Sequence, residues 1–550
     1  MILRPSRRGG SWYRRRPSLI ACLLAFFVVL LFIQTRIHHG PAEPASPSVP
    51  RPEAAAEPDQ QPVPDAQPPS KTVSPLLDNQ AKFWRSLYQI ILNNDPNCKN
   101  APDRVVPQKL DIGFDPTQDR QRPDLLYMDT ADVKRMREAH SNFVSDMKSI
   151  PHLPYESGSR GIVMTGGFNQ LPVLVISVRM LRRTGSDLPV EVFVADESEW
   201  DDQICKVVLP SLNAKCLLFS DIFHAANTGV SIDRYQFKII AILFSSFEEV
   251  LLLDSDAFPV NNPLALFEKE PFKSSGLIVW PDFWYPSESP YFFEIAKIAA
   301  MPRLTERASV ESGELMYSKA KHHMSLMLAA YYNYYGPGYY YPLLSQGAPG
   351  EGDKETFAWA AIALNEPYYA VHERVMALGR HDTNGNYLGS AMAQHDPIAD
   401  HNFTEAHGPP TDTGKDNHFD MQASEVKPFF IHANFPKFDP STIFGHQMTD
   451  FADEVVGGPT RDSNGTNVRC WMDPARAVEL FGFDVERRFW EEIKTTACEY
   501  EQQFGTWRGK TGICLRTQEY WDDVFGAGTS ATPLDDRQRM DASVEIPSPP

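Results

Sequence analysis

The sequence lacks the short motifs that mark several common classes of enzyme. None of its seven cysteines forms a Cys-x-x-Cys pair, which argues against a zinc ribbon or a dithiol redox site. The first predicted strand ends in Thr165-Gly166-Gly167, which is neither a Gly-x-Gly-x-x-Gly turn nor a Walker loop. A Rossmann dehydrogenase and a P-loop NTPase therefore both lose support.

Positive charge is scarce relative to negative charge. The 550 residues include 52 Lys and Arg against 71 Asp and Glu, so the formal net charge is −19. Proteins that bind nucleic acid in general usually carry an excess of basic residues, so we expect no nucleic-acid partner. A nucleotide bound through a metal ion is compatible with this charge.

Aromatic residues are missing between residues 41 and 78, where Pro, Ala, Glu, Gln and Ser dominate. Such a segment buries no core, so we interpret residues 38–80 as an extended stem. Before it, an uncharged run from Leu19 to Ile33 predicts a transmembrane signal anchor over residues 19–37, with 1–18 as a cytosolic tail rich in arginine. A cleaved signal peptide is the alternative, but Gly40-Pro41-Ala42 is a poor cleavage site.

Six cysteines would then lie in an oxidising lumen and could form up to three disulfides. Cys205 and Cys216 are plausible partners at short separation. One bridge is predicted among Cys470, Cys498 and Cys514, and Cys98 or a strand cysteine would take the third.

Apolar strands alternate with helical patterns from residue 161 onward. Strands are predicted at 161–167, 190–195, 215–219 and 250–253, and helices between them at 171–181, 204–209 and 232–247. This alternation predicts an α/β fold with a parallel sheet of the nucleotide-binding type. We expect a helical neck at 81–155, a main domain at 156–450, a C-terminal extension of it at 451–525, and a disordered tail at 526–550.

One predicted strand runs directly into two carboxylates. Leu251-Leu252-Leu253 is followed by Asp254-Ser255-Asp256. Ligands of such sheets bind beyond the carboxyl ends of the strands, and paired carboxylates there suit a hard cation such as Mg²⁺ or Mn²⁺. The sequence therefore predicts a cation site that could hold a diphosphate, although acidic triplets also occur by chance on surface loops.

Other candidates could complete such a site. His432 ends an apolar strand and is the candidate third metal ligand, and Lys437 follows within reach of a phosphate. Before the acidic turn, Arg234 and Lys238 are four residues apart and predicted to share a helix face with Tyr235 nearby. They would neutralise phosphate, unless they form an ordinary solvated face.

Two further segments have both a functional and a structural interpretation. Backbone amides of Thr165, Gly166 and Gly167 could approach a nucleotide, or form a plain turn. Asp353 and Glu355 could orient a sugar hydroxyl or assist proton removal, or simply favour a helix N-terminus. The tyrosine-rich stretch 331–341 fits an acceptor-binding wall or buried packing equally well.

Taken together, these stretches resemble the fungal Golgi α-mannosyltransferase family, and within it the α-1,2 branch-initiating type. The resemblance is carried by Arg160-Gly161-Ile162-Val163 to Asn169, Tyr235-Gln236-Phe237-Lys238, Leu251 to Asp256 with Pro259, Glu311-Ser312-Gly313-Glu314, Gly352 to Phe357, and His432. It covers roughly half of the chain.

The resemblance implies a GT-A fold, GDP-mannose as donor and Mn²⁺ (or Mg²⁺) as cofactor. It implies Asp254 and Asp256 as the metal and diphosphate site and, by looser analogy, extends to Lys238 and His432. Mannose would move with retained configuration to a mannose-containing glycan. The protein would be a single-pass type II protein of the Golgi membrane, with other mannosyltransferase subunits as conceivable partners.

Two alternatives stay open at this point. A transferase of the same fold could use a UDP-sugar, because the sequence does not distinguish guanine from uracil recognition. A non-catalytic, lectin-like lumenal subunit could use the acidic turn as a structural cation loop. A glycosidase is disfavoured because the two carboxylates are too close to act as opposed acid and base.

Overall fold

The structure is a computed structural model that describes residues 74–99, 102–104, 110–150, 152–230, 232–382, 384–409, 425–445, 448–449 and 455–526. From Thr72 onward the chain forms one compact unit. The predicted cytosolic tail, anchor, most of the stem and most of the C-terminal tail lie outside the described residues. Within the described ranges, no helix combines the length and apolar character needed to cross a bilayer. The domain boundaries given above stay predictions.

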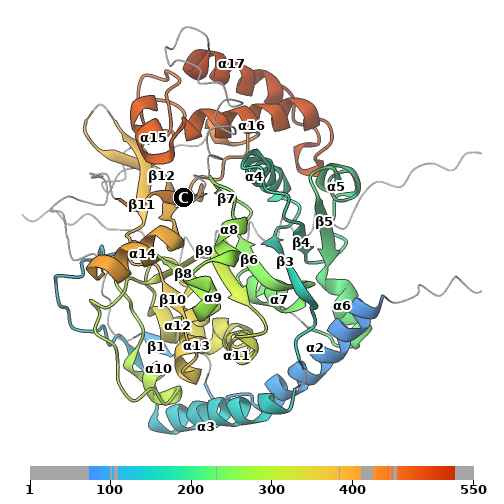
Figure 1. Cartoon of the computed structure of the whole chain (residues 1–550), viewed down its shortest axis with the longest axis vertical. Coiled ribbons are helices and arrows are strands. Elements are labelled where there is room, and N and C mark those ends of the chain that lie inside the picture. Colours follow the sequence, from blue (N-terminus) through green and yellow to red (C-terminus); the bar gives the residue numbers. More distant parts are fainter. Residues whose placement is uncertain are drawn as a thin grey trace, which may run out of the picture. The chain divides into compact units, whose positions relative to one another are not determined.

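A seven-stranded sheet forms the centre, in the order β10-β8-β9-β6-β3-β4-β5 (Figure 1). Its strands are β3 (Glu156–Thr165), β4 (Val190–Val194), β5 (Ala214–Leu218), β6 (Phe247–Leu253), β8 (Leu277–Pro281), β9 (Val310–Ser318) and β10 (Tyr369–Ala370). The prediction of an α/β sheet is confirmed.

The prediction that this sheet is parallel throughout is wrong at one strand. β9 runs antiparallel to both of its neighbours, β6 and β8. The reason is that residues 282–309 return the chain to the edge at which β8 ends, instead of crossing back to the opposite edge. The start of β9 therefore lies beside the carboxyl end of β6, which proves important for the site.

Helices cover both faces of this sheet. The helices are α2 (Pro75–Asn93), α3 (Thr130–Asp146), α4 (Leu171–Arg183), α5 (Leu209–Ser211), α6 (Phe219–Ala226), α7 (Gln236–Phe244), α8 (Leu264–Glu268), α9 (Phe272–Ser275), α10 (Pro290–Ile295), α11 (His323–Tyr334), α12 (Tyr341–Ser345), α13 (Lys354–Leu364), α14 (Pro397–His407), α15 (Pro474–Phe481), α16 (Val485–Tyr500) and α17 (Ile513–Phe525).

Alternation along the central strands supplies the two apolar layers. Val163 and Leu252 face a cluster formed with α2, α3, α7, α11 and α13. Their neighbours Ile162 and Leu251 face a second cluster with α4. This period of two fixes the register of β3 and β6, because a slip by one residue would turn each apolar set to the wrong side.

A smaller antiparallel sheet stands next to the first, with the order β11-β12-β13-β7. Its strands are β7 (Ala257–Pro259), β11 (Met376–His381), β12 (Tyr387–His395) and β13 (Pro428–His432). Helices α15, α16 and α17 pack on it through a core that includes Trp471 and Trp490, and they gather at one end of the molecule (Figure 1). Each fully buried large side chain of this kind contributes roughly 1.5–3 kcal/mol. Short two- and three-residue strands elsewhere are β1 (Asp103–Arg104), β2 (Leu126–Tyr127), β14 (Met448–Thr449) and β15 (Val455–Gly457).

The disulfides confirm two of the predicted bridges. Cys205 pairs with Cys216, and Cys498 pairs with Cys514, which ties α16 to α17. The prediction of a third bridge is wrong for the described residues, where Cys98 and Cys470 are both free. Cys470 is enclosed in the third core with α16 and α17, away from any other described cysteine.

The tyrosine-rich stretch is core rather than a sugar-binding wall. Tyr331, Tyr332 and Tyr340 are fully buried, and Tyr331 stacks on Phe143 of α3 with ring centroids 4.2 Å apart. The buried hydroxyl of Tyr332 lies 2.8 Å from Nε2 of His140. This part of the chain therefore anchors α3 to α11.

The burial of His140 predicts that the fold is sensitive to acid. Burial, with a smaller contribution from the charge of Lys297, lowers the pKa of His140 to about 4. Between pH 6.5 and 4 the unfolded chain then binds more protons at this residue than the folded chain, so stability is full above pH 6.5 and falls as the pH drops. At pH 5 the loss from His140 alone is about 2 kcal/mol. We expect urea unfolding of His140→Gln to show a flatter dependence on pH than the wild type, and equal slopes would contradict this account.

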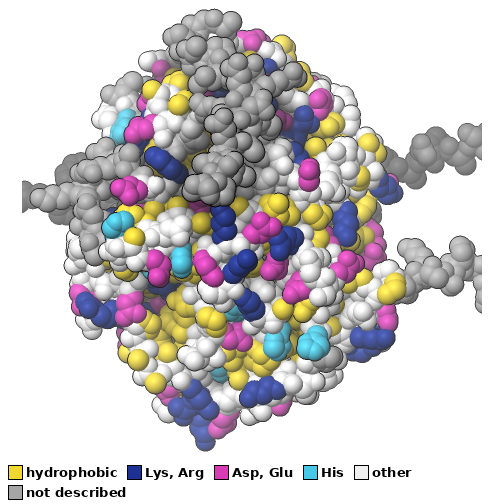
Figure 2. All heavy atoms as spheres, viewed as in Figure 1, with side chains coloured by type: hydrophobic (Ala, Val, Ile, Leu, Met, Phe, Trp, Pro, Cys, Tyr) yellow, Lys and Arg dark blue, Asp and Glu magenta, His cyan; other side chains and the backbone are white. Residues whose placement is uncertain are grey.

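Charges of both signs are interspersed on the face of the described residues shown in Figure 2. Lys and Arg side chains alternate there with Asp and Glu. This face therefore carries a mixture of both signs of charge.

Candidate active site

The acidic turn lies where the two sheets meet. Asp254 to Asp256 connect β6 of the central sheet to β7 of the smaller sheet. The backbone N–H of Asp254 donates to the carbonyl of Gly313 in β9 (2.7 Å), and Ser177 of α4 donates to the carbonyl of Ser255 (2.8 Å). The turn is therefore held from both sides, and Asp256 is only 1% exposed.

Strand register brings His432 to this turn. His432 is the last residue of β13 and pairs directly with Ala257, the first residue of β7. Its Nε2 lies 3.3 Å from Oδ1 of Asp256 and 3.7 Å from Oδ2 of Asp254. Its Nδ1 lies 2.7 Å from Oε1 of Glu311, at the start of β9. The two sheets thus converge on one histidine between three carboxylates.

Opposite charges hold this cluster together. Burial alone would lower the pKa of His432, but Asp256 and Glu311 outweigh it and raise that pKa well above its usual value. Burial alone would likewise raise the pKa of Asp256, but the charges of His432 and Lys437 hold it well below its usual range. In its protonated form the histidine balances the negative charge of the turn.

The cluster fits a divalent cation. Asp254, Asp256 and His432 offer one ligand atom each within 4.8 Å of one another. The contact of Asp256 Oδ1 with His432 lacks hydrogen-bond geometry, so this buried oxygen has no hydrogen-bond partner among the described residues. Glu311 supports the other ring nitrogen of His432, as carboxylates commonly do behind metal-ligating histidines.

Lys238 positions one of the carboxylates. Its Nζ lies 2.9 Å from the carboxylate of Asp254 and 2.8 Å from the carbonyl of Ser312. Burial would lower the pKa of Lys238, but Asp254 and Asp353 outweigh that effect and raise it. The ammonium group is therefore permanently charged and is engaged with the protein on two sides.

A cavity of about 780 Å³ opens beside this cluster. Its walls include the turn after β6, parts of α7, β9, α13, β11, β12 and β13, and the segments after β8 and β13. The lining residues are Asp111, Gly113, Tyr235, Lys238, Asp254, Asp282, Phe283, Trp284, Glu311, Ser312, Gly350, Glu351, Asp353, Lys354, Ala377, Gly389, Ser390, Ala391, Met392, His432, Asn434 and Phe435. The volume lies in the range of roughly 300–1,000 Å³ typical of small-molecule sites.

Asp353 faces this cavity from the residue before α13. Its Oδ1 accepts a hydrogen bond from Ser312 Oγ (3.2 Å), and its buried Oδ2 has no hydrogen-bond partner among the described residues. Burial raises its pKa to about 6, against the opposing effect of Lys238. One acceptor oxygen is therefore left for a ligand hydroxyl.

Glu355, predicted beside Asp353, does not line the cavity. Two residues along the chain correspond to a rotation of roughly 200° about the helix axis, which places it on the other side of α13. There Arg307 (2.9 Å), Ser309 Oγ (2.8 Å) and the N–H of Val310 (2.8 Å) bind its carboxylate. The carboxylate fixes the start of β9 and is 2% exposed. Its position gives it no direct access to a ligand in this cavity.

The basic pair is not arranged as predicted. Helix α7 begins at Gln236, and Arg234 precedes it with a positive φ of 48°. Arg234 therefore shares no helix face with Lys238; its side chain is 80% exposed and ion-paired only with the adjacent Asp233 among the described residues. Tyr235, in contrast, lines the cavity and is 48% exposed.

Lys437 lies at the rim of the cluster. It forms an ion pair with Oδ2 of Asp256, yet its side chain is 53% exposed. A long side chain that touches the buried carboxylate while half of it remains in solvent can turn to an incoming anion. Lys437 thus joins the cluster as a cation from the segment after β13.

Thr165 ends β3, the strand next to β6, and Gly166 and Gly167 follow it; none of the three lines the cavity. A side chain on Gly167 would collide with the carboxylate of Glu199, and one on Gly166 with Leu174. The glycines are therefore explained by close packing at this turn, and a role in donor binding stays a prediction.

Sequence reasoning missed several cavity residues. Asp282 and Lys354 form a buried ion pair (2.7 Å) in the wall, and Ser390 lines the opposite side from β12. Strand β12 contains small residues rather than β-branched ones, so its sequence gives little strand signal. Glu311 lies in one of the stretches that carry the family resemblance, but its contact with His432 depends on the antiparallel direction of β9.

Comparison with known proteins identifies the class. A family model described for mannosyltransferases matches residues 159–308 and 303–396. The chain is 34% identical over 482 residues to the α-1,2-mannosyltransferase MNN21 of Candida albicans, covering 76% of this chain and 71% of that protein. It is 30% identical over 452 residues to the α-1,2-mannosyltransferase MNN2 of Saccharomyces cerevisiae, covering 67% and 74%.

The protein is therefore an enzyme, an α-mannosyltransferase, as the sequence resemblance predicted. More particularly, the chain belongs to the family of fungal α-1,2-mannosyltransferases that contains these MNN2- and MNN21-type proteins.

Solved glycosyltransferases are only distantly similar. GlyE of Streptococcus pneumoniae TIGR4 matches with 13% identity and a TM-score of 0.27, covering 38% of this chain and 45% of that one. The galactosyltransferase LgtC in complex with donor and acceptor sugar analogues matches with 12% identity and a TM-score of 0.24, covering 38% and 73%.

Proposed function

We propose that this enzyme transfers mannose from GDP-mannose to a mannose hydroxyl of a glycoprotein or mannan acceptor and forms an α-1,2 linkage. The observation that carries the proposal is the cluster of Asp254, Asp256 and His432 at the carboxyl end of β6, open to a cavity of about 780 Å³. The names of the fungal relatives support mannose as the sugar and α-1,2 as the linkage. In this proposal the central sheet is of the GT-A type.

Asp254, Asp256 and His432 would hold Mn²⁺ or Mg²⁺. A bound cation of this kind would offset the charge that builds up on the departing diphosphate. His432 would have to lose its proton to act as a ligand, since a metal-ligating imidazole is neutral. Glu311, 2.7 Å from Nδ1, would then keep the ring turned toward the two aspartates.

Lys238 and Lys437 would have different roles. Lys238 keeps Asp254 in place through its contacts with that carboxylate and with Ser312. Lys437 is half exposed and would turn from Asp256 toward the donor phosphates, where its charge stabilises the leaving group.

Asp353 would orient a sugar hydroxyl, because its partnerless Oδ2 faces the cavity. Mannose leaves an α-linked donor and arrives α-linked, so its configuration would be retained. Attack by the acceptor hydroxyl from the face of the departing diphosphate needs no protein nucleophile.

The proposed setting is the Golgi lumen. The arginine-rich N-terminus and the apolar run from Leu19 to Ile33 would anchor the chain as a single-pass type II membrane protein. Other mannosyltransferase subunits are proposed as partners on the same membrane.

A donor screen tests this function. The detergent-solubilised full chain is incubated with a mannoside acceptor and either GDP-mannose or a UDP-sugar, with Mn²⁺ or with EDTA. With Mn²⁺ present, we expect transfer from GDP-mannose and none from the UDP-sugar. Transfer should be lost in EDTA and recovered on adding Mn²⁺, and linkage determination should show an α-1,2 product.

Thermal melts of the same protein give an independent measurement. We expect Mn²⁺ with GDP to raise the melting temperature more than Mn²⁺ with UDP, because a ligand that binds only the folded state stabilises it. Stabilisation by UDP but not GDP would contradict the proposed donor. Metal binding without any transfer would favour the lectin-like alternative.

A further inference from the structure

A second cavity lies at the same edge of the central sheet. It has a volume of about 390 Å³, and its walls include Pro281 at the end of β8 and the segment Ala370–Val375 at the end of β10. The volume is within the range of ~300–1,000 Å³ that small-molecule sites occupy. None of the residues assigned above to the metal cluster lines it.

Asp282 is the wall that the two cavities share. It lines both of them and is fixed by Lys354 (2.7 Å) and by the backbone N–H of Phe283 (2.7 Å). A strap formed by residues 111–116 passes over the same region, where Gly113 faces the first cavity and Phe114 the second. The strap is held by backbone hydrogen bonds to residues 283–285 and by Arg374, which donates to the carbonyl of Phe114. Asp282 and this hydrogen-bonded segment therefore lie between the two cavities.

The order of strands in the central sheet indicates on which side of the metal cluster the acceptor binds. β6, which ends in the metal cluster, has β3 and β4 on one side and β9, β8 and β10 on the other. Thr165, for which the sequence predicts a role in donor binding, ends β3, and Gly166 and Gly167 follow it directly. We therefore place the acceptor on the other side of β6, toward β9, β8 and β10. On that side the first cavity extends to Asp282, and the second cavity continues from Asp282 to β10.

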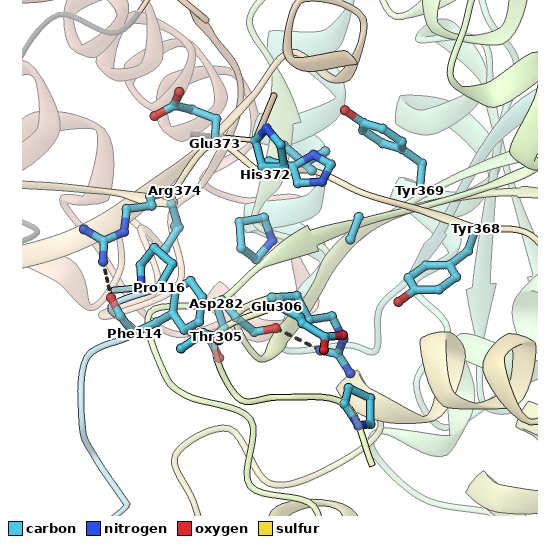
Figure 3. A pocket seen from close by; sticks show the side chains of 18 of the residues that line it. Phe114, Pro116, Asp282, Thr305, Glu306, Tyr368, Tyr369, His372, Glu373 and Arg374 are labelled. Carbon is cyan, nitrogen blue, oxygen red and sulfur yellow. Dashed lines mark hydrogen bonds between the residues drawn. The ribbon is translucent and has the colours of Figure 1, made fainter. Parts of the chain in front are cut away.

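The lining of the second cavity suits a neutral sugar. Tyr368 and His372 offer rings, while Glu306 and the guanidinium of Arg374 offer hydrogen-bonding groups, and Figure 3 shows these side chains around one opening. Nε of Arg374 is a buried donor without a hydrogen-bond partner in the described part of the chain. Sugar rings present apolar faces to aromatic side chains and hydroxyls to polar ones, and small-molecule sites combine both kinds of wall.

We propose that the second cavity is an acceptor subsite, which binds sugar units of an oligomannoside beyond the unit that receives the new mannose. This inference rests on the proposed function, because it takes the acceptor to be a mannose-containing chain. It implies that the enzyme measures acceptor length: a chain that spans both cavities binds more tightly than one that fills the first alone.

Two substitutions alter the second cavity in opposite ways. Thr305→Trp fills it from a turn, and Tyr368→Ala removes one of its rings; both residues are half-buried. Tyr127→Ala is the matched control, because Tyr127 is 53% exposed and lines neither cavity. Binding of methyl α-mannoside and of a mannotetraose to the full chain is followed by intrinsic tryptophan fluorescence, and KM is measured for the same two acceptors with GDP-mannose and Mn²⁺.

We expect the wild type to bind the tetraose about tenfold or more tightly than the monosaccharide, a difference of about 1.4 kcal/mol. In Thr305→Trp and Tyr368→Ala this ratio should fall toward one, while Tyr127→Ala keeps the wild-type ratio. Equal binding of both acceptors by the wild type, or an unchanged ratio in both variants, would overturn the inference. Absence of transfer from GDP-mannose with a length-dependent affinity that the variants lose would refute the proposed function and leave the subsite standing.

Discussion

Asp256→Asn is expected to lower the rate of mannose transfer at least about a thousandfold. The carboxylate is almost completely buried, and its Oδ1, 3.3 Å from Nε2 of His432, has no hydrogen-bond partner among the described residues. Asparagine keeps the shape but removes the charge and replaces one oxygen by an NH2 group that cannot act as a ligand. A cation's stabilisation of developing charge is worth several kcal/mol, and about 4 kcal/mol corresponds to a thousandfold in rate.

The experiment separates loss of chemistry from loss of fold. kcat is measured with saturating GDP-mannose and Mn²⁺, and thermal melts are recorded with and without Mn²⁺. Asp256→Asn should melt cooperatively and lose the stabilisation by Mn²⁺. The control Asp78→Asn replaces an exposed aspartate of α2 that is paired only with Lys82 in the described structure and should behave as the wild type. If Asp256→Asn retained both its rate and its metal-induced stabilisation, the cluster would not be the metal site.

The parts of this site that the sequence predicted are those set by local pattern. Asp254 and Asp256 follow an apolar strand, and a strand-end position is readable from three preceding leucines. His432 also ends an apolar strand. The register of β13 against β7, with His432 opposite Ala257, then brings the histidine to the aspartates. The positions of these two strand ends were sufficient to predict the cluster, because β6 and β13 both end at the junction of the two sheets.

The parts that the sequence did not predict depend on long-range geometry. The contact of Glu311 with His432 requires β9 to run antiparallel, and nothing in the pattern of residues 310–318 encodes direction. Glu355 is a buried structural carboxylate because α13 turns it toward Arg307, which lies 48 residues earlier in the chain. Arg234 leaves the helix face because α7 starts two residues later, and helix starts are among the least certain features of a sequence pattern. The sequence was therefore sufficient to predict the fold class, but it did not show which charged residues lie in the site and which lie in the core.

Gly313→Ala tests the geometry of the site without changing any charge. Gly313 lies in β9 between Glu311 and the turn, and its carbonyl accepts the N–H of Asp254. A Cβ atom built there would stand well inside van der Waals contact with Nδ1 of His432 and 2.7 Å from Oε1 of Glu311. Neither side chain has room to yield, because both are buried and bonded to each other. The added methyl group should therefore push the imidazole away from its supporting carboxylate.

Loss of such support typically costs 10- to 100-fold in metal affinity or activity, and we expect Gly313→Ala to need about 10- to 100-fold more Mn²⁺ for half-maximal activity. Gly229→Ala is the matched control, because a Cβ at Gly229 meets open space. The decisive measurement is a Mn²⁺ titration of the transfer rate for both variants, with thermal melts to show that each is folded. A rate that recovers at high Mn²⁺ places the defect in cation binding by His432, as the contact geometry predicts. A rate that stays low at all concentrations of Mn²⁺ while the fold is intact would instead show that Gly313 acts on the sugar, and an unchanged titration would mean that His432 is not a ligand at all.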